Sequence, residues 1–488
     1  MQLPFGEWLP DLPDHVNPGA TQARNVFPAV TSYRPFNSIA ATSSNALTAR
    51  CQGGKAFKSD SGVVSIFAGD ATKLYKLTSN AFVDESGGTT FSYPAESYWD
   101  FIRFGEVVIA FNGDDAPQAW TLDSSTDFAA LSGSPPVFRH AAVVGNFIVT
   151  GFQPTLQNKV QWSSFNSATS WTVGTNQSDS ETLPEGGVIT GVTGGQYGLI
   201  FQESRITRMD YRGGNVVFQF RRIEDNRGAV QGKNVIQVGN MVYYLSEDGF
   251  YVTDGNASRP IGANKVDRFF YNDLKFALRE RVRASYDHEN KLIMWSYPSA
   301  TGNNSGTLND KILIFHIASN RWSIVELEHE VIIDYLSPGF TLEELDDYPA
   351  SGTNDIDAIT VSFDSPIFIG GLRTVGAFST DHKLGSFNGD TLAAEIGTGE
   401  TEIFPTSRSL ISNVRPLVNT AAATGSLTFR DRVADSFSTT ASSSMHSTGN
   451  IPLRKSARYF KFNLNIPAGT SWSDAQGIDI EATNEGYR

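Results

Sequence analysis

The sequence predicts a protein built almost entirely of β-strands: a β-propeller of six or seven blades, preceded by an extended arm and followed by a C-terminal β-sandwich or barrel domain. Three observations lead to this fold class. A strand-turn-strand pattern recurs at a nearly constant step, the composition favours short strands, and Gly, Asn and Asp residues gather where the strands turn.

The repeat consists of an apolar strand, a Gly/Asn/Asp turn and a second strand rich in aromatic residues. Clear copies are GEVVIAFNGDDAPQAW from Gly105 and GNMVYYLSEDGFYVTDG from Gly239. The first strands of six copies are placed at Val63, Val107, Phe147, Leu199, Val242 and Leu292. The steps between them are 44, 40, 52, 43 and 50 residues, and a four-stranded propeller blade needs roughly 40 to 50 residues.

The composition favours the same class. The chain has 44 Gly, 33 Phe and only 18% charged residues, which is typical of aromatic-rich strands joined by tight turns rather than of helices with charged faces. At 488 residues it is too long for one ordinary core. We therefore expect two large units, one of them the repeat ring.

The charge and the termini exclude several classes. A formal net charge of −14 argues against a protein that grips nucleic-acid phosphates, because such a grip needs clustered cations; it does not exclude a surface past which DNA slides. The single cysteine, Cys51, cannot form a disulfide framework or a multi-cysteine metal site. No apolar run approaches the roughly 20 residues that span a bilayer, and the N-terminus lacks signal-peptide features. We expect synthesis in the cytoplasm without stable membrane insertion.

Residues 1–48 read as an extended arm, because closely spaced prolines prevent a helix or a central strand. Aromatic residues lie between these prolines, namely Phe5, Trp8, Phe27 and Phe36. Such an arm lies on another surface. Two interpretations stay open: a strap that closes the chain's own ring, or a contact with a neighbouring subunit.

Residues 49–338 carry the blades. Within them, DKILIFHIASNRWSIV from Asp310 predicts the outer hairpin of the sixth blade. The pattern of strands is interrupted from Val266 to Ala284, where the spacing of apolar residues predicts a helix interrupted near Asn272. We interpret its basic residues, Arg279, Arg281 and Arg283, as a solvated helical face in preference to a partner-facing one.

Three segments follow the blades. Residues 339–364 are predicted to be an acidic linker or loop between domains, because prolines, glycines and carboxylates are concentrated there. Residues 365–390 are predicted to be a hairpin that closes the ring by pairing with the N-terminal blade, which would remove free strand edges. Residues 391–488 contain further strands at the spacing of a small sandwich or barrel.

No enzyme signature is found in the sequence. The carboxylates considered for a glycosidase lie at predicted hairpin turns, where Asp is expected for its backbone geometry: Asp114, Asp115, Asp248 and Asp254. The histidines lack metal-ligand spacing: His15, His140, His288, His316, His329, His382 and His446. Phosphate-binding loops and nucleophile elbows are absent too. We expect a protein that is not an enzyme and holds no metal or cofactor.

Several stretches resemble the structural tail proteins of short-tailed bacteriophages. They are DGFYVTDGNASRPIGANKVDRFF from Asp248, DHENKLIMWSYPS from Asp287 and DKILIFHIASNRWSIVE from Asp310. The C-terminal run STDHKLGSFNGDTLAAEIGTGETEIFP from Ser379, with RYFKFNLNIPAGTSWSDAQGI from Arg458, looks like the end domain of the same family. Together these segments make up about a fifth of the chain.

The resemblance implies a tail nozzle or hub related to packaged-DNA stabilisation proteins. In that family a propeller-bearing subunit forms a homohexameric ring below the portal and adaptor, and the ring encloses the channel that holds and later releases the genome. Expected partners are further copies of the chain, the adaptor proteins, tail fibres or spikes, and phage DNA passing without sequence-specific contacts. The location implied is the tail of the virion, assembled in the host cytoplasm.

A negative channel wall would keep DNA from sticking during ejection. The candidate lining is the acidic loop with Glu343, Glu344, Asp346 and Asp347, which is as well explained as a solvated linker. The alternative function is a carbohydrate- or receptor-binding propeller of a tail, with exposed tryptophans stacking on sugars. The candidates are Trp99, Trp120, Trp162 and Trp171, although blade tryptophans usually belong to the core.

Overall fold

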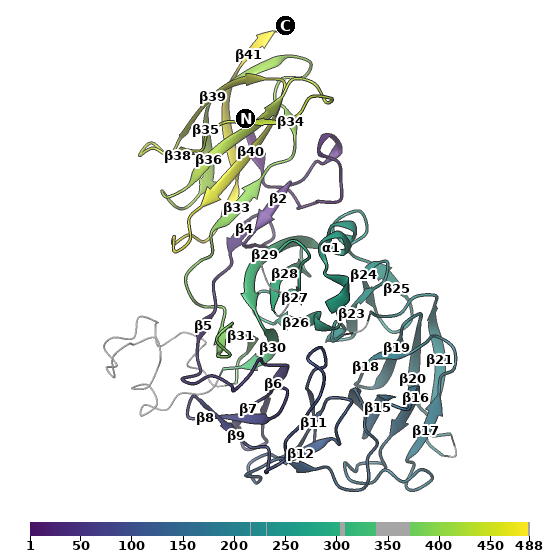
Figure 1. The fold of residues 1–488 in the computed structure, drawn as a ribbon. Helices are drawn as coiled ribbons and strands as arrows, with labels where there is room; N and C mark the ends of the chain where they lie inside the picture. The colour runs from purple at the N-terminus through teal and green to yellow at the C-terminus, as the bar shows by residue number, and fades with distance from the viewer. Residues whose placement is uncertain (215, 231, 303–307, 338–370, 487–488) are drawn as a thin grey trace.

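The computed structural model describes residues 1–214, 216–230, 232–302, 308–337 and 371–486. Figure 1 shows a propeller-like body of many small sheets with a second, elongated β lobe above it. The described part of the chain is nearly all β, with a single short α-helix and two 3-10 helices. This confirms the predicted all-β class.

The body consists of seven four-stranded units among the described residues, each a run of antiparallel neighbours. Units 1 to 3 are β6 (Gly53–Lys58), β7 (Val64–Gly69), β8 (Leu74–Thr78) and β9 (Ala81–Asp84); β10 (Asp100–Phe104), β11 (Val107–Phe111), β12 (Gln118–Thr121) and β13 (Ala129–Ala130); and β14 (His140–Val144), β15 (Phe147–Gln153), β16 (Leu156–Trp162) and β17 (Asp179–Thr182).

Units 4 to 6 continue the same order along the chain. They are β18 (Ile189–Thr193), β19 (Tyr197–Gln202), β20 (Arg205–Tyr211) and β21 (Phe218–Asp225); β22 (Ile236–Val238), β23 (Met241–Ser246), β24 (Gly249–Thr253) and β25 (Ser258–Pro260); and β26 (Arg283–Asp287), β27 (Leu292–Tyr297), β28 (Asn309–His316) and β29 (Arg321–His329). The pairing of β28 with β29 is the outer hairpin predicted from Asp310 onward.

The seventh unit joins distant parts of the chain. It comprises β30 (Val331–Leu336), β31 (Arg373–Phe378), β32 (Leu384–Ser386) and, from the arm, β5 (Ala40–Ala41). Its first strand, β30, also pairs in parallel with β6 of unit 1. The six sequence repeats thus correspond to units 1 to 6, with the strand taken as the first in each repeat being the second in its unit.

Glycine turns explain why the first hairpins form where they do. The turns from β10 to β11, β14 to β15 and β22 to β23 have two residues, the first being Gly105, Gly145 and Gly239 with φ of 59°, 55° and 62°. Glycine at the first central position is the pattern of a type II′ turn, whose twist matches that of paired strands. These Gly-Glu and Gly-Asn pairs are the starts of the sequence repeats.

Each pair of neighbouring units shares an apolar core. Phe67 and Trp120 lie between units 1 and 2, and Phe111 and Trp171 between units 2 and 3. Equivalent clusters lie between units 3 and 4, 4 and 5, 5 and 6, and 6 and 7. A last cluster, which includes Phe82 and Phe378, lies between unit 7 and unit 1.

The predicted interrupted helix is confirmed. Helix α1 (Asp267–Asp273) is followed by the 3-10 helix η2 (Phe276–Arg281), and the break between them lies at Leu274 and Lys275, close to the predicted position. Buried Phe270 fixes α1 against Phe250 of β24 and Tyr297 of β27.

The second lobe is the end domain, formed by two sheets that share one core. Its strands are β33 (Ala394–Gly397), β34 (Thr401–Glu402), β35 (Arg408–Val418), β36 (Thr424–Arg430), β37 (Ser438–Thr439), β38 (Ser443–Ser444), β39 (Ile451–Ala457), β40 (Tyr459–Ile466) and β41 (Ala475–Gly486). Fully buried Ile411, Leu427, Leu464 and Ile478 fill the space between the sheets.

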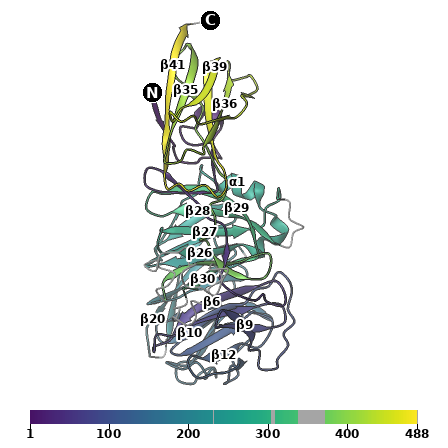
Figure 2. The same cartoon turned by 90° about the vertical axis from the view of Figure 1, so that its left-hand side faces the viewer.

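The N-terminal arm ties the two lobes together. It contains β1 (Gln2–Pro4), the 3-10 helix η1 (Asp14–Val16), β2 (Gln22–Arg24), β3 (Val26–Pro28) and β4 (Tyr33–Pro35), before β5. β1 and β4 pair with β41 of the end domain, and β2 lies between β29 of unit 6 and β33. One eleven-stranded sheet therefore runs from the propeller-like body into the end domain, and Figure 2 shows the two lobes in line.

Candidate binding site

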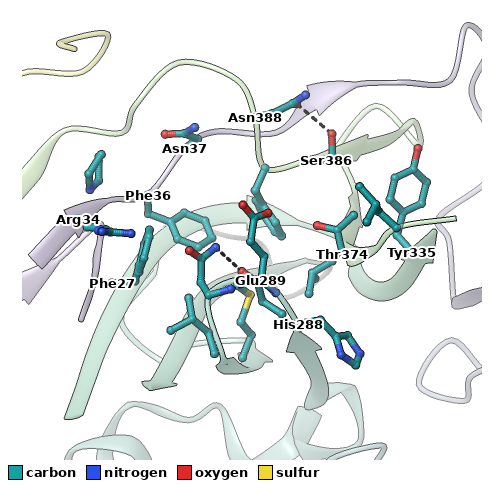
Figure 3. A pocket seen from close by; sticks show the side chains of 18 of the residues that line it. Phe27, Arg34, Phe36, Asn37, His288, Glu289, Tyr335, Thr374, Ser386 and Asn388 are labelled. Atoms are coloured by element: carbon teal, nitrogen blue, oxygen red, sulfur yellow. Dashed lines mark hydrogen bonds between the residues drawn. The ribbon is translucent and has the colours of Figure 1, made fainter. Parts of the chain in front are cut away.

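A large hollow lies where the arm, the propeller-like body and the end domain meet. Its volume is about 1160 Å³. Its walls come from arm residues between 27 and 42, the turn from β26 to β27, strands β30 and β31, residues 386–388 and residues 472–474 of the end domain. Figure 3 shows Phe27, Arg34 and Phe36 on the arm side and His288, Thr374 and Tyr335 on the side of the body. We call this hollow the interlobe cleft.

Aromatic side chains form much of the cleft wall. Phe36 is 4% exposed, and its ring lies 5.0 Å from that of Phe387 at an angle of 58°. Phe27 and Phe387 are half-buried, whereas Trp472 is almost fully buried behind the surface. The cleft thus offers apolar ring surface that remains partly open.

Polar side chains in the same cleft have no partner among the described residues. They are the amide of Asn37, the carboxylate of Glu289, the guanidinium of Arg373 and the hydroxyl of Thr374. Asp287 differs, because its carboxylate accepts hydrogen bonds from the backbone of Glu289 at 2.9 Å and from the Asn290 side chain at 2.8 Å. Asp287 therefore builds the turn, while the unpartnered groups are available to a ligand.

The charge balance of the cleft is nearly even. Arg34 pairs with Asp474 at 3.5 Å, and Arg373 and Glu289 carry opposite charges. Burial, helped by the positive charge of Arg373, lowers the pKa of His288, so this imidazole is neutral at pH 7.

A second polar cluster lies where the first strands of the units converge. Lys233, just before β22, pairs with Asp100 of β10. Burial alone would raise the pKa of Asp100, but Lys233 and Lys55 together lower it. Burial lowers the pKa of Lys233, opposed by Asp100. Asp100 belongs to unit 2 and Lys233 precedes the first strand of unit 5, so the ion pair crosses the middle of the body. Lys55 comes from unit 1.

A third cluster holds the seam between units 7 and 1. The carboxylate of Glu330, whose side chain is fully buried, accepts a hydrogen bond of 2.8 Å from the backbone of Cys51 and pairs with His382. Burial raises the pKa of Glu330. His382 adopts a positive φ of 61° in the turn between β31 and β32, so this contact connects the closing hairpin to the start of unit 1.

The arm aromatics are packed within their own chain. Phe5 is 2% exposed and Trp8 3% exposed, in the core shared by units 5 and 6 and the end domain. Phe36 lies in the core of units 6 and 7, and Phe27 borders the cleft. This packing agrees with the interpretation of the arm as a strap on its own chain. The arm both completes unit 7 and joins the two lobes. A subunit contact made by the arm stays a prediction.

The other predicted site residues fall into two groups, one outside the described residues and one buried in the body. Glu343, Glu344, Asp346 and Asp347 lie outside the described residues. The four tryptophans proposed for sugar stacking, Trp99, Trp120, Trp162 and Trp171, are at most 3% exposed, so the hypothesis that they bind sugars is wrong. They fill the cores between the units, as large apolar rings do when neighbouring sheets offer a buried surface.

The aspartates at turns serve local structure. Asp254 accepts backbone hydrogen bonds from Asn256 and Ala257, Asp248 pairs with Arg227, and Asp115 accepts from Asn112. Asp114 accepts a hydrogen bond from the Ser97 hydroxyl at 3.3 Å.

The interpretation of the basic residues after α1 as a solvated face is wrong for two of them. Arg281 and Arg283 are each 7% exposed. Arg281 pairs with Glu96, and Arg283 stacks over the ring of Tyr98 at 4.1 Å. Burial lowers the pKa of Arg283 to about 10, and it remains charged at pH 7.

The described ranges contain neither a cluster of metal ligands nor a membrane-spanning helix. There, no three His, Cys, Asp or Glu residues come together as metal ligands. No helix in those ranges has the length and apolar character to cross a membrane.

No family model and no curated protein matches the chain. Among solved structures, the extracellular domain of the hybrid two-component system BT4673 from B. thetaiotaomicron is 8% identical, with a TM-score of 0.42. The match covers 87% of this chain and 47% of that structure, so this chain spans about half the length of that structure. The Neurospora crassa Pan2 WD40 domain is also 8% identical, with a TM-score of 0.36 and coverage of 62% and 90%. At these scores the likeness carries no inference about function.

The cleft was missed by sequence reasoning. Its walls come from six segments separated by up to several hundred residues, and no local motif marks them. The sequence marks the cleft only through Phe27 and Phe36, which it places among the aromatic contacts of the arm.

Proposed function

We propose that this chain is a closed seven-bladed β-propeller with an end domain, and that it serves as a structural subunit of a short-tailed phage tail. In this role six copies form a nozzle or hub below the portal and adaptor. The ring retains the packaged DNA and then releases it. The virion tail is the proposed location, after assembly in the host cytoplasm.

Ring closure of the propeller is supported by the packing of its units. Every sequential pair of units shares an apolar core, and so do unit 7 and unit 1. The hydrogen bond from Cys51 to Glu330 and the parallel pairing of β30 with β6 lie at the same seam. A closed ring leaves no open sheet face at either end of the repeat.

The observation that carries the tail proposal is the connection of the two lobes by β2. The segments that resemble tail proteins lie on both sides of it: they include α1 and β27 to β29 in the body, and β33 and β40 in the end domain. Because β2 pairs with both lobes, the strands β27 to β29, β33 and β40 belong to one continuous sheet. A subunit of a ring that contains DNA benefits from such a joint, because the two lobes keep their relative position under load.

The charge supports a conduit between copies. A net charge of −14 would repel phosphates at the short distances over which charges act in salt. The acidic loop with Glu343, Glu344, Asp346 and Asp347 is the proposed lining. Lys233 and Asp100 cross the middle of each propeller, so the proposed lumen is the space enclosed by several copies and not the propeller axis.

The proposed subunit contacts use the tips of the arm. Val16 is 55% exposed and Val30 71% exposed, while the arm aromatics are occupied within the chain. A cyclic ring needs two different patches on each copy, and exposed apolar tips suit one of them.

Negative-stain electron microscopy tests the proposal. The purified chain is imaged alone and mixed with a portal–adaptor complex from a short-tailed phage. A six-fold ring on the adaptor is the expected result. Monomers that ignore the adaptor at assembly concentrations would overturn it.

A further inference from the structure

We propose that the interlobe cleft binds a neutral oligosaccharide. This activity goes beyond the tail-subunit role and does not depend on ring assembly. It also differs from sugar binding by the blade tryptophans, since the groups that would make the contacts are different and lie at the joint of the two lobes.

The first argument is the shape and the apolar surface of the cleft. Ligand sites are concave, of roughly 300 to 1,000 Å³, and lined by aromatic groups with a few polar ones. At about 1160 Å³ the cleft is slightly larger than this range, which gives room for an extended ligand. The half-buried rings of Phe27 and Phe387 give flat apolar patches. The apolar C–H face of a sugar ring suits such a patch.

The second argument is the supply of hydrogen-bonding groups. Asn37, Thr374, Glu289 and Arg373 have no partner among the described side chains. The amide oxygen of Asn388 accepts a bond of 2.9 Å from Ser386, which leaves its NH₂ group free. The set contains donors and acceptors. Hydroxyl groups, which do both, match such a mixed set.

The third argument is charge. Arg34 is neutralised by Asp474 at 3.5 Å, Arg373 is offset by Glu289, and His288 is neutral at pH 7. Asp287 adds one negative charge, held within its turn by hydrogen bonds. A cleft without a surplus of cations offers little to a sulfated, phosphorylated or sialylated ligand. The chemistry therefore favours an uncharged glycan.

The rigid surroundings add to this inference. Phe27, Asn37 and Arg34 stand on the arm, which is held on both sides by strand pairing, and Thr374 stands on β31, an inner strand of unit 7. Groups held in place before binding lose little conformational entropy when the ligand arrives. Such a site binds without rearrangement of the lobes.

The test uses the full chain and an array of neutral oligosaccharides built from glucose, galactose and N-acetylglucosamine, with sialylated and sulfated glycans on the same array. Titration calorimetry with the best neutral binder follows. We expect the double variant Asn37→Ala/Asn388→Ala to bind about tenfold more weakly or worse, as the loss of one or two hydrogen bonds predicts. Phe387→Ala should weaken binding similarly.

Phe165→Ala is the matched control, because Phe165 is 40% exposed on unit 3, away from the cleft. It should leave affinity unchanged. No binding to any neutral glycan, binding only to charged glycans, or equal affinity in the double variant would overturn the proposal. Ring formation on the adaptor, scored by microscopy on the same variants, should persist, so failure of the glycan site and failure of the tail role are distinguished.

Discussion

Removal of the Trp8 side chain tests the role of the arm as the joint between the lobes. Trp8 is 3% exposed, its ring lies 5.1 Å from that of Phe269 on α1, and its indole N–H donates to the backbone oxygen of Thr21 at 3.3 Å. A buried aromatic side chain removes about 150 to 250 Å² from water. At about 25 cal/mol per Å² this corresponds to about 4 to 6 kcal/mol. Alanine retains a part of it, so Trp8→Ala should cost about 3 to 5 kcal/mol, as large-to-small core changes do.

The effect of Trp8→Ala should be local, because several cores in the body do not include this residue. Hydrogen exchange by mass spectrometry is therefore the suitable assay. The amide of Phe5 donates to Gln476 at 2.9 Å and that of Leu9 to Ala20 at 3.2 Å. Both should exchange about two orders of magnitude faster or more in the variant, since about 1.4 kcal/mol corresponds to a factor of ten.

Phe165→Ala, which removes an exposed ring, should leave exchange in the arm unchanged. Unchanged protection of residues 2–9 in Trp8→Ala would refute the view that the arm is held by this core. Loss of protection throughout all seven units would refute the claim that the joint can loosen without unfolding the propeller-like body.

Three further substitutions test the polar clusters and the packing of the units. The pKa of the Glu330 carboxyl is raised in the folded state. Its contribution to stability is therefore present below the unfolded pKa and is lost as the pH rises through the folded pKa. Relative to Glu330→Gln, the melting temperature of the wild type should fall as the pH increases from about 4.5. The pKa of the Asp100 carboxyl is lowered in the folded state. Asp100→Asn leaves Lys233 without its partner and should lower the free energy of unfolding by about 1 to 3 kcal/mol at pH 7. Urea unfolding should show that the difference between wild type and variant shrinks as the pH falls below about 4. Gly69→Ala would place its Cβ 2.2 Å from the ring of Trp99, so calorimetry should find a destabilisation of about 1 to 3 kcal/mol, and an unchanged melting temperature would contradict this packing.

The sequence was most informative where structure is decided locally. Turns that start with Gly105 and Gly145 require backbone angles that glycine adopts without strain, so the second strand of each unit was located well. The first strands were missed. They include GGKAFK of β6 and IQV of β22, in which glycine or polar residues interrupt the apolar pattern because one face points toward the middle of the body.

Features that depend on distant segments were beyond the reach of sequence patterns. Arg281 looks like part of a basic helical face, and only folding brings it to Glu96, 185 residues away in the chain. The same holds for the interlobe cleft, where Phe27 of the arm and Thr374 of unit 7 border one space. No periodicity relates such residues, because their proximity results from the pairing of β2 and β5 with strands far along the chain.

The position of the Lys233–Asp100 pair limits how this chain could form a conduit. In the proposed closed propeller, side chains that meet across the middle of the body would obstruct the axis of a single copy, and separating the pair would leave two partly buried charges without their partner. A passage for DNA therefore requires several copies around a common axis, with the body and end domain of each copy fixed by the arm. The arm serves both proposals, because it holds the joint on which a ring of copies depends and carries Phe27 and Asn37 to the cleft. Weakening the joint by Trp8→Ala should consequently impair ring assembly and glycan binding together, whereas Asn37→Ala/Asn388→Ala should impair glycan binding alone.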